Sequence, residues 1–313
     1  MSDFISALLE TIAQHGFPID TNQINWQSTA IQRFKNIKRP KQKDLFLRIH
    51  HDFLGANFGD WHDQSQWVVW RWKQNKPLSI VDRQDNDHQR LLYEQRKSRE
   101  RSHAIKRLTI LWNEYCHEID IDNPNIPIHN YIRQKRIRPL YARSCRSVIV
   151  LPVRDIDYDL VSLQFIKVDG FKRFKHHAQF KDAMVWLSEP LPEGYSGDIR
   201  ICEGWATGCT IYDAIGAPVV CAMSAGNLVS VATQLRKKYP HAWLKICADN
   251  DQWGSDNVGI HYAVEAAKAT NATIYWPEFN GLDCSKKPTD FNDLQCLAGI
   301  EAVENQLLFL RKQ

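Results

Sequence analysis

The chain has 313 residues, of which 43% are hydrophobic and 24% charged, and a formal net charge of +4. This length allows about two domains, and the apolar fraction is typical of globular proteins and excludes a disordered or fibrous chain. No apolar run approaches the roughly 20 residues that a membrane-spanning helix needs, and the acidic Asp3 stands where a signal peptide would be basic, so we expect a mature protein without a membrane partner.

All eight cysteines lie from Cys116 onward, and none forms a Cys-x-x-Cys pair. Cys202, Cys221 and Cys247 fall within apolar segments, where a free thiol behaves as a small hydrophobic group. This favours a reducing, cytoplasmic location over a disulfide framework, and no zinc is expected near the N-terminus.

Charge is distributed unevenly along the chain. Three segments are strongly basic: Arg33–Arg48, Arg96–Arg107 and Arg133–Arg146. The clustered aspartates lie in the last third. This polarity favours a protein that binds a polyanion with one region and metal ions with another.

Residues 1–80 are predicted to form a first unit, with a helix at about 3–15 and strands within 45–73, where large aromatic residues alternate. Residues 85–118 contain no Gly or Pro and predict a long charged helix, so 81–120 is expected to be a helical linker.

Four tryptophans in the first unit allow two interpretations. Such a stripe usually belongs to a core, and a platform for bases is the alternative. They are Trp61, Trp67, Trp70 and Trp72. Three nearby histidines have no cysteine partner and no metal-ligand spacing, which favours surface or core roles. They are His50, His51 and His62.

Residues 129–198 predict an antiparallel, strand-rich unit containing "SVIVLPVRD" and "LVSLQFIKVDGFKRFK". From Asp198 onward, apolar strands alternate with helices at 205–215, 227–239, 257–270 and 299–311. This alternation predicts an α/β fold with a parallel sheet covered on both faces, whose ligands bind beyond the carboxyl ends of the strands.

Carboxylates follow successive strands of this predicted sheet. Glu203 follows the first strand, Asp249 and Asp251 follow the third, and Asp290 and Asp293 follow the fourth. Residues two apart in an extended segment face the same way, so the Asp-x-Asp pair can point into one site. Hard oxygen donors without imidazole or thiolate suit Mg²⁺ or Mn²⁺. Taken singly, each Asp could be a helix cap or turn residue, and Glu203 a solvated loop acid.

The segment from about 199 to 300 resembles the Toprim domain, which bacterial primases share with topoisomerases and some nucleases. "CEGWATG" looks like its glutamate motif and "ADND" like its Asp-x-Asp motif; "TDFNDL" and "AMSAGNL" resemble elements of the plasmid and phage primase branch. "HNYIRQKRI", "SVIVLPVRD" and "LQFIKVDGFKRF" are similar to the basic half of the primase core. The glutamate motif usually has an aspartate where this chain has Thr207, which leaves a ligand role there in doubt.

The resemblance implies four parts: an N-terminal nucleic-acid-binding module without zinc (1–80), the helical linker (81–120), the basic half of a primase core (121–198) and a Toprim catalytic domain (199–313). "ANFGDWHDQSQWVVW" looks like the N-terminal module of primases that lack a zinc finger.

It also implies a DNA primase, a DNA-directed RNA polymerase that makes short RNA primers on single-stranded DNA from ribonucleoside triphosphates, in the bacterial cytosol. Two-metal nucleotidyl transfer would need divalent ions, Mg²⁺ or Mn²⁺. We expect Asp249, Asp251 and Asp290 to hold the ions and Glu203 to act as general acid/base or shared ligand. Asp293 and Asn292 would orient them from outside. No phosphate-loop motif is present, so a separate helicase is expected.

Six basic residues are candidates for binding the phosphates of template and nucleotide: Arg133, Lys135, Arg154, Lys172, Arg173 and Lys175. For each the alternative is a solvated surface cation. "GFKRFK" interleaves aromatics with cations, which suits single strands. Two other functions remain open: a Toprim nuclease, and a replication or defence factor that only binds nucleic acid.

Overall fold

The computed structural model describes residues 2–17, 19–35, 43–50, 55–61, 63, 66–72, 80–123, 127–174 and 181–309. The predictions for His51, His62 and Lys175 lie outside these residues. The chain divides into two compact units, Met1–Glu100 and Arg101–Gln313. Among the described residues, no helix combines the length and the apolar character that crossing a bilayer requires.

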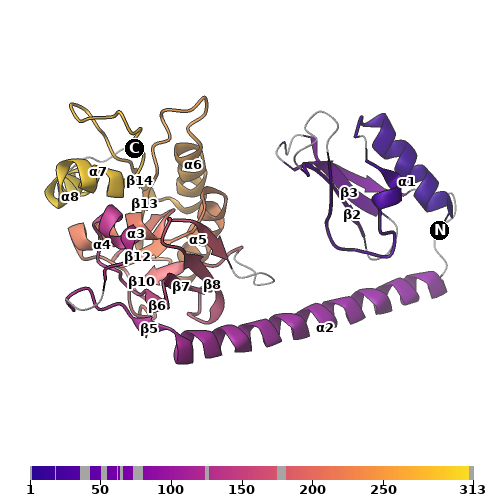
Figure 1. The fold of residues 1–313 in the computed structure, drawn as a ribbon, viewed down its shortest axis with the longest axis horizontal. Helices are drawn as coiled ribbons and strands as arrows, with labels where there is room; N and C mark the ends of the chain where they lie inside the picture. The colour runs from indigo at the N-terminus through magenta and orange to yellow at the C-terminus, as the bar shows by residue number, and fades with distance from the viewer. Residues whose placement is uncertain are drawn as a thin grey trace. The chain divides into compact units, whose positions relative to one another are not determined.

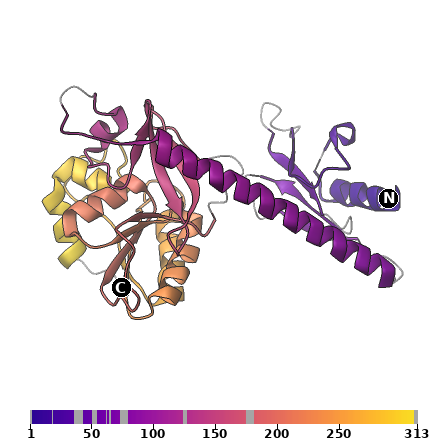
Figure 2. The same ribbon diagram turned by 90° about the horizontal axis from the view of Figure 1, so that it is seen from below.

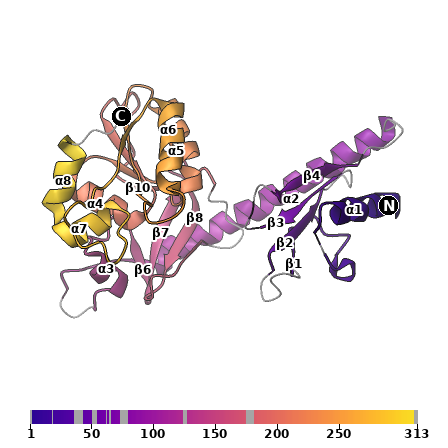
Figure 3. The same cartoon turned by 90° about the horizontal axis from the view of Figure 1, so that it is seen from above.

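The N-terminal unit pairs one helix with an antiparallel sheet. The helix is α1 (Ser2–Gln14), and the strands, in sheet order, are β1 (Gln32–Phe34), β2 (Leu45–Ile49), β3 (Gly55–Asp60) and β4 (Val68–Arg71). Phe4, Leu8 and Ile12 recur at helical spacing and pack against the inward side chains of β2 and β3. Helix α1 therefore covers one face of the sheet (Figures 1 and 3).

The sheet separates the four tryptophans into two pairs. Trp70 and Trp72 pack against Phe4 of α1, with ring centroids 5.4 and 5.7 Å away. Trp61 and Trp67 instead gather around Phe46, at 5.7 and 5.1 Å. The core interpretation holds for the first pair, because only those two side chains belong to the cluster under α1.

Helix α2 (Ile80–Ile110) runs without a break along its length (Figure 2) and ends in a π-helical turn, Leu111–Tyr115. The predicted long helix is therefore present, and it begins five residues earlier than expected.

The second unit contains two sheets. The first is antiparallel, in the order β5 (His117–Glu118), β6 (Arg143–Cys145), β7 (Val148–Arg154), β8 (Leu160–Ile166) and β9 (Lys172–Phe174). A short helix that the sequence analysis missed, α3 (Asn130–Lys135), precedes β6. It has too few residues to display a helical period.

The second sheet has the order β10 (Val185–Leu187), β12 (Val219–Cys221), β11 (Asp198–Cys202), β13 (Trp243–Cys247) and β14 (Thr273–Tyr275). Strands β11 to β14 are parallel, as predicted, and β10 is antiparallel to β12. Because β10 lies before residue 198, the sheet extends across the predicted 198/199 boundary. The four-part division of the chain stays a prediction, and residues 101–313 form one compact unit.

Helices cover both faces of this sheet (Figures 1 and 3). One layer contains α5 (Ala225–Lys238) and α6 (Val258–Thr270); the other contains α4 (Trp205–Ile215), α7 (Phe291–Ala298) and α8 (Ile300–Phe309). Along β11, Ile199 and Ile201 face the first layer and Cys202 faces the second. The continuous apolar strands predicted from sequence are thus buried on two sides.

Candidate active site at the carboxyl ends of the parallel strands

Glu203 leaves β11 where the sheet meets the start of α5. The amide of Met223 donates to the Glu203 carbonyl at 2.8 Å, which extends the ladder with β12 by one residue. Burial and repulsion from Asp251 raise the pKa of the Glu203 carboxyl, and the backbone N–H of Ala225, which donates to that carboxyl, opposes the rise. A helix N-terminus thus holds an acid that is predisposed to carry a proton.

Asp249 follows β13 and is the most strongly perturbed acid of the site. Its Oδ1 atom is buried and accepts no hydrogen bond within the described part of the chain. Burial raises the pKa of this carboxyl well above its ordinary value, and repulsion from Asp290 and Glu203 adds to the shift. A buried oxygen without a donor is costly unless a cation or a proton satisfies it.

Asp251 contacts the beginning of α6. Its Oδ2 atom accepts the amide N–H of Gly259 at 3.0 Å, and its own N–H donates to Asn257 Oδ1 at 2.9 Å. The N-cap of α6 is Asn257, and Asp251 adds a hydrogen bond to the first turn of that helix without being its cap. This bond uses one lone pair of a carboxylate, and the remaining lone pairs can still face Glu203, whose pKa Asp251 raises.

Asp290 is the N-cap of α7 and is satisfied on both oxygens. Oδ1 accepts the Asp293 amide at 2.7 Å, and Oδ2 accepts the Thr207 hydroxyl at 3.1 Å. Burial and repulsion from Asp293 raise its pKa, while Lys135 and these hydrogen bonds oppose the rise. Thr207, where related motifs have an acid, thus donates to an acid of the site.

Asn292 and Lys135 connect α7 to α3. Asn292 Nδ2 donates to the Lys135 carbonyl at 2.7 Å and to Thr210 Oγ1 at 2.9 Å. Lys135 Nζ lies 3.3 Å from Asp293 Oδ1. Desolvation alone would lower the pKa of Lys135, but attraction to Asp290 and Asp293 outweighs it, and the pKa rises. Asn292 thus positions a cation of the basic half beside the acids.

Lys172 is the second cation at this site. Its Nζ lies 5.5 Å from the Tyr131 ring centroid, within cation–π range. Burial and repulsion from Lys135 lower the pKa of Lys172, against the attraction of Asp290 and Glu203. By its accessible surface, however, Lys172 is an exposed residue, so this lowering of its pKa is small in effect where solvent screens the charge. The structure therefore brings acids and cations from both sheets together.

The other basic candidates lie apart from the acids. Arg133 and Arg173 are exposed, and among the described residues no side-chain hydrogen bond or ion pair joins either of them to the acids. Arg154 and Lys172 lie beside opposite ends of β8. Leu160, at the start of β8, pairs with Arg154, whereas Ile166, at its end, pairs with Lys172.

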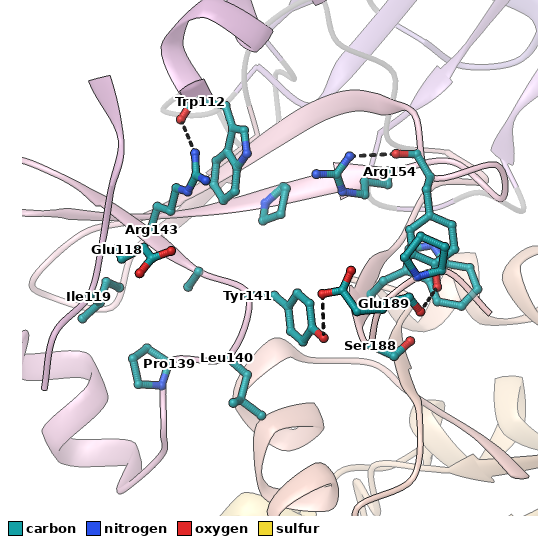
Figure 4. Close-up of a pocket in the computed structure, with 15 residues that line it drawn as sticks. Trp112, Glu118, Ile119, Pro139, Leu140, Tyr141, Arg143, Arg154, Ser188 and Glu189 are labelled. Atoms are coloured by element: carbon teal, nitrogen blue, oxygen red, sulfur yellow. Dashed lines mark hydrogen bonds between the residues drawn. The ribbon is translucent and has the colours of Figure 1, made fainter. Parts of the chain in front are cut away.

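Arg154 instead lines a separate cavity of about 670 Å³ (Figure 4). There its guanidinium donates to the Tyr158 carbonyl at 2.7 Å. Burial and repulsion from Arg143 lower the pKa of Arg154. Figure 4 shows Arg143 beside Trp112 and the Tyr141 hydroxyl turned toward Glu189. The structure thus does not bring Arg154 to the acidic cluster.

The donors present suit a hard divalent cation. Carboxylate oxygens are the ligands that Mg²⁺ and Mn²⁺ prefer, and Asp249 Oδ1 is buried without a donor. As placed, no three His, Cys, Asp or Glu side chains of the described residues are gathered closely enough to form a ready-made metal group. Asp251 accepts a first-turn amide of α6 and Asp290 caps α7, which holds both carboxylates toward the helix ends.

Several positioning residues escaped the sequence analysis. Asn257 Nδ2 donates to Asn250 Oδ1 at 2.8 Å, which fixes the turn between the two aspartates and α6. Asn227 Nδ2 donates to the carbonyls of Ala183 and Ala222, which ties the start of α5 to the segment before β10. Asn227 belongs to the quoted "AMSAGNL" stretch, which was the only signal pointing to it.

The C-terminal part has the architecture of a Toprim domain: residues 198–301, a third of the chain, match the family model described as "Toprim domain". Two Escherichia coli proteins described as "DNA primase TraC" are 30% and 28% identical to this chain over 133 residues, 41% of its length. That region is only 12% and 9% of those relatives. The primase fragment of the bacteriophage T7 primase-helicase protein superposes with a TM-score of 0.39 at 18% identity, covering 51% of this chain and 62% of that one.

Proposed function

We propose that this chain is a DNA primase that joins ribonucleoside triphosphates on a single-stranded DNA template. One observation carries the proposal: Lys135 Nζ lies 3.3 Å from Asp293 Oδ1 and the Lys135 carbonyl accepts from Asn292, which places a cation of the basic half beside the acids that follow the parallel strands. The Toprim match and the similarity to the TraC primases support it.

Each charged group has a distinct role in this proposal. Glu203 would accept the proton of an attacking hydroxyl, and its raised pKa makes it a stronger base than an ordinary carboxylate. Lys172 and Lys135 would neutralise phosphates of the triphosphate or template. Asn292 holds the α3 end that carries Lys135 against α7.

Asp249, Asp251 and Asp290 would hold Mg²⁺ or Mn²⁺, with Asp249 Oδ1 as the open ligand. Such ions supply neutralisation of the triphosphate and activation of the hydroxyl nucleophile. Asp293 keeps Asp290 in place through its amide and keeps Lys135 in place through its carboxylate. Zinc does not suit this donor set.

Incubation of the whole chain with single-stranded DNA, labelled ribonucleotides and Mg²⁺ or Mn²⁺ tests the proposal. Short oligoribonucleotides are expected. Glu203→Gln and Asp249→Asn should each reduce synthesis roughly a hundredfold or more. The matched controls are Glu265→Gln and Asp283→Asn, which neutralise exposed acids outside the cluster.

Full primer synthesis by the two cluster variants would overturn the assignment of the site. Cleavage of the template instead of synthesis would identify a nuclease, and a gel shift without either reaction would identify a binding protein. In both cases the primase proposal fails. The proposal includes a separate helicase, because primer synthesis needs an unwound template. It also includes a cytosolic location.

A further inference from the structure

The N-terminal sheet has a second face, opposite α1, that the proposed function does not use. Along β2, Leu45, Leu47 and Ile49 point into the core under α1. Successive strand residues point to opposite faces, so Phe46 and Arg48 lie on the other side. We call that side the outer sheet face.

The strand register shows which residues are neighbours on the outer sheet face. Arg33 pairs with Phe46, which pairs with Gly59. In the next outward row, Arg48 pairs with Asn57, which pairs with Val69. These two rows place six residues on the outer sheet face: Arg33, Phe46, Arg48, Asn57, Gly59 and Val69. Trp61, Trp67 and Arg71 lie on the same face.

Two tryptophans are fixed on this face. Trp67 Nε1 donates to the Asp60 carbonyl at 2.7 Å, and its ring packs edge-on to Phe46 at 5.1 Å. The loop before β4 crosses β3 so closely that a Cβ at Gly59 would lie 2.6 Å from the Gln66 carbonyl oxygen. Gly59 therefore allows the loop to hold Trp67 over the sheet.

The rings remain accessible although they are held in place. Trp61 and Trp67 are 38% and 43% exposed, and Val69 is 71% exposed. The ring centroids of Trp61 and Trp67 lie 6.0 Å apart. Large apolar side chains gathered and exposed on one face mark a binding surface more often than single exposed ones do.

Arginines border the aromatic cluster, which also adjoins the buried Asp44, whose carbonyl accepts the Trp61 amide at 2.7 Å. The Arg33 guanidinium lies 4.3 Å from the Trp61 ring centroid and donates to the Lys43 carbonyl through two nitrogens. Arg48 and Arg71 occupy the neighbouring outward positions. No described outward position of β1 to β4 carries a carboxylate.

We propose that the outer sheet face binds single-stranded DNA, with bases stacked on Trp61 and Trp67 and phosphates paired with Arg33 and Arg48. Half-exposed aromatic rings beside arginines provide stacking and phosphate contacts together, which unpaired strands require; Arg33 covers one face of Trp61, so a base would use the other face or displace it. The positive rim is complementary to a polyanion and disfavours an apolar protein partner. This names a second template contact for the proposed primase, in the other compact unit from the acidic cluster.

The test measures binding of the whole chain to fluorescently labelled dT12 by anisotropy. Trp61→Leu keeps apolar bulk and removes the stacking ring. It should weaken dT12 binding about 5- to 150-fold, the range for loss of one base–aromatic stack. The matched control is Trp243→Leu, which removes a 66% exposed tryptophan from β13. An abasic strand of equal length should bind the parent chain and Trp61→Leu alike.

Arg48→Gln supplies a second test that leaves the aromatic cluster intact. A plot of log affinity against log salt has a negative slope, and this substitution should make it shallower by about 0.7, the value for one phosphate contact on a single strand. The charge-matched control is Arg96→Gln on α2, whose guanidinium pairs with Glu100 at an exposed site. Circular dichroism verifies that each variant is folded.

Equal affinity of Trp61→Leu, Arg48→Gln and both controls for dT12 would overturn the proposal, and so would preference for duplex over dT12. The measurement is independent of primer synthesis, because it is made without ribonucleotides. If the chain binds dT12 through this face but makes no primer, the primase proposal fails and this one stands.

Discussion

The Thr207 hydroxyl donates a hydrogen bond to Asp290 Oδ2 at 3.1 Å. Thr207 is almost fully buried in the first turns of α4, whereas Asp290 caps α7 more than 80 residues later in the chain. The bond lowers the pKa of a carboxyl that burial and Asp293 raise. A neutral donor at this position therefore stabilises the charged form of an acid in the cluster without adding a charge to it.

Thr207→Val should remove this donor while conserving shape. The pKa of Asp290 is expected to rise further, so the acidic limb of the pH–rate profile for primer synthesis should move to higher pH. Stability should fall by about 1–2 kcal/mol, because a buried acceptor loses its donor. Thr233→Val is the control, since that exposed hydroxyl bonds only within its own helix. An unmoved limb would show that Asp290 does not depend on Thr207.

Lys172 should set the alkaline limit of activity. Burial and Lys135 lower its pKa, so it loses its charge at a lower pH than an ordinary lysine. Lys172→Arg keeps the charge and should shift the alkaline limb to higher pH. Lys172→Gln should raise the KM for nucleotide or template and, by removing a cation near Glu203, raise the pKa of that acid.

The control for these variants is Lys167→Gln, an exposed lysine on the same hairpin. If Lys172→Gln behaves like Lys167→Gln in KM and in pH profile, Lys172 is a surface cation and has no place in the site.

The acidic cluster should destabilise the fold at neutral pH when no divalent cation is present. The pKa of Asp249 is raised in the folded chain, so the folded state holds its proton at pH values where the unfolded state, with an ordinary carboxyl pKa near 3.9, has lost it. Protonation of Asp249 contributes its full stabilisation of the fold below pH ~4, and this stabilisation is lost as the pH rises through the raised pKa of Asp249. In EDTA, the Tm of the second unit should therefore rise as the pH is lowered through the raised pKa of Asp249.

Asp249→Asn should abolish that gain and raise the Tm at pH 7 in EDTA by a few degrees, which corresponds to ~1 kcal/mol in a domain of this size. Mg²⁺ or Mn²⁺ should raise the Tm of the parent chain and not of the variant. Differential scanning calorimetry measures both. Identical thermal shifts in the two proteins would argue against a cation at Asp249.

Gly259 is required by the close approach of α6 to the strand end. A Cβ at this position would lie 2.3 Å from the Asp249 carbonyl oxygen. Gly259→Ala should therefore displace the Asp-x-Asp turn, cost ~2 kcal/mol or more, and reduce activity. Gly226→Ala, in α5, meets nothing within 4 Å and should be neutral or slightly stabilising. Chemical denaturation compares the two, and equal stabilities would contradict the close approach.

The fold of the C-terminal part could be predicted because its signals are local. The apolar runs around Ile199 and Ile246 and the helix between Trp205 and Ile215 have the periods and lengths of strands and helices. The signals for β10 and α3 are weaker, because a three-residue strand and a six-residue helix show no complete period. Their places depend on partners far away in the chain, such as β12 and α7.

The sequence alone determined which side chains could form the site, since parallel strands place all their carboxyl ends at one edge and the chain places an acid after three of them. The tertiary structure decided how each acid is held. Asp251 bonds to the first turn of α6, Asp290 caps α7, and Asp249 was left with a buried open oxygen. Lys135 and Lys172 joined the cluster, while Arg154 lined a different cavity. The reason is physical: desolvation and Coulomb forces depend on distances through space, which residue spacing along the chain does not fix.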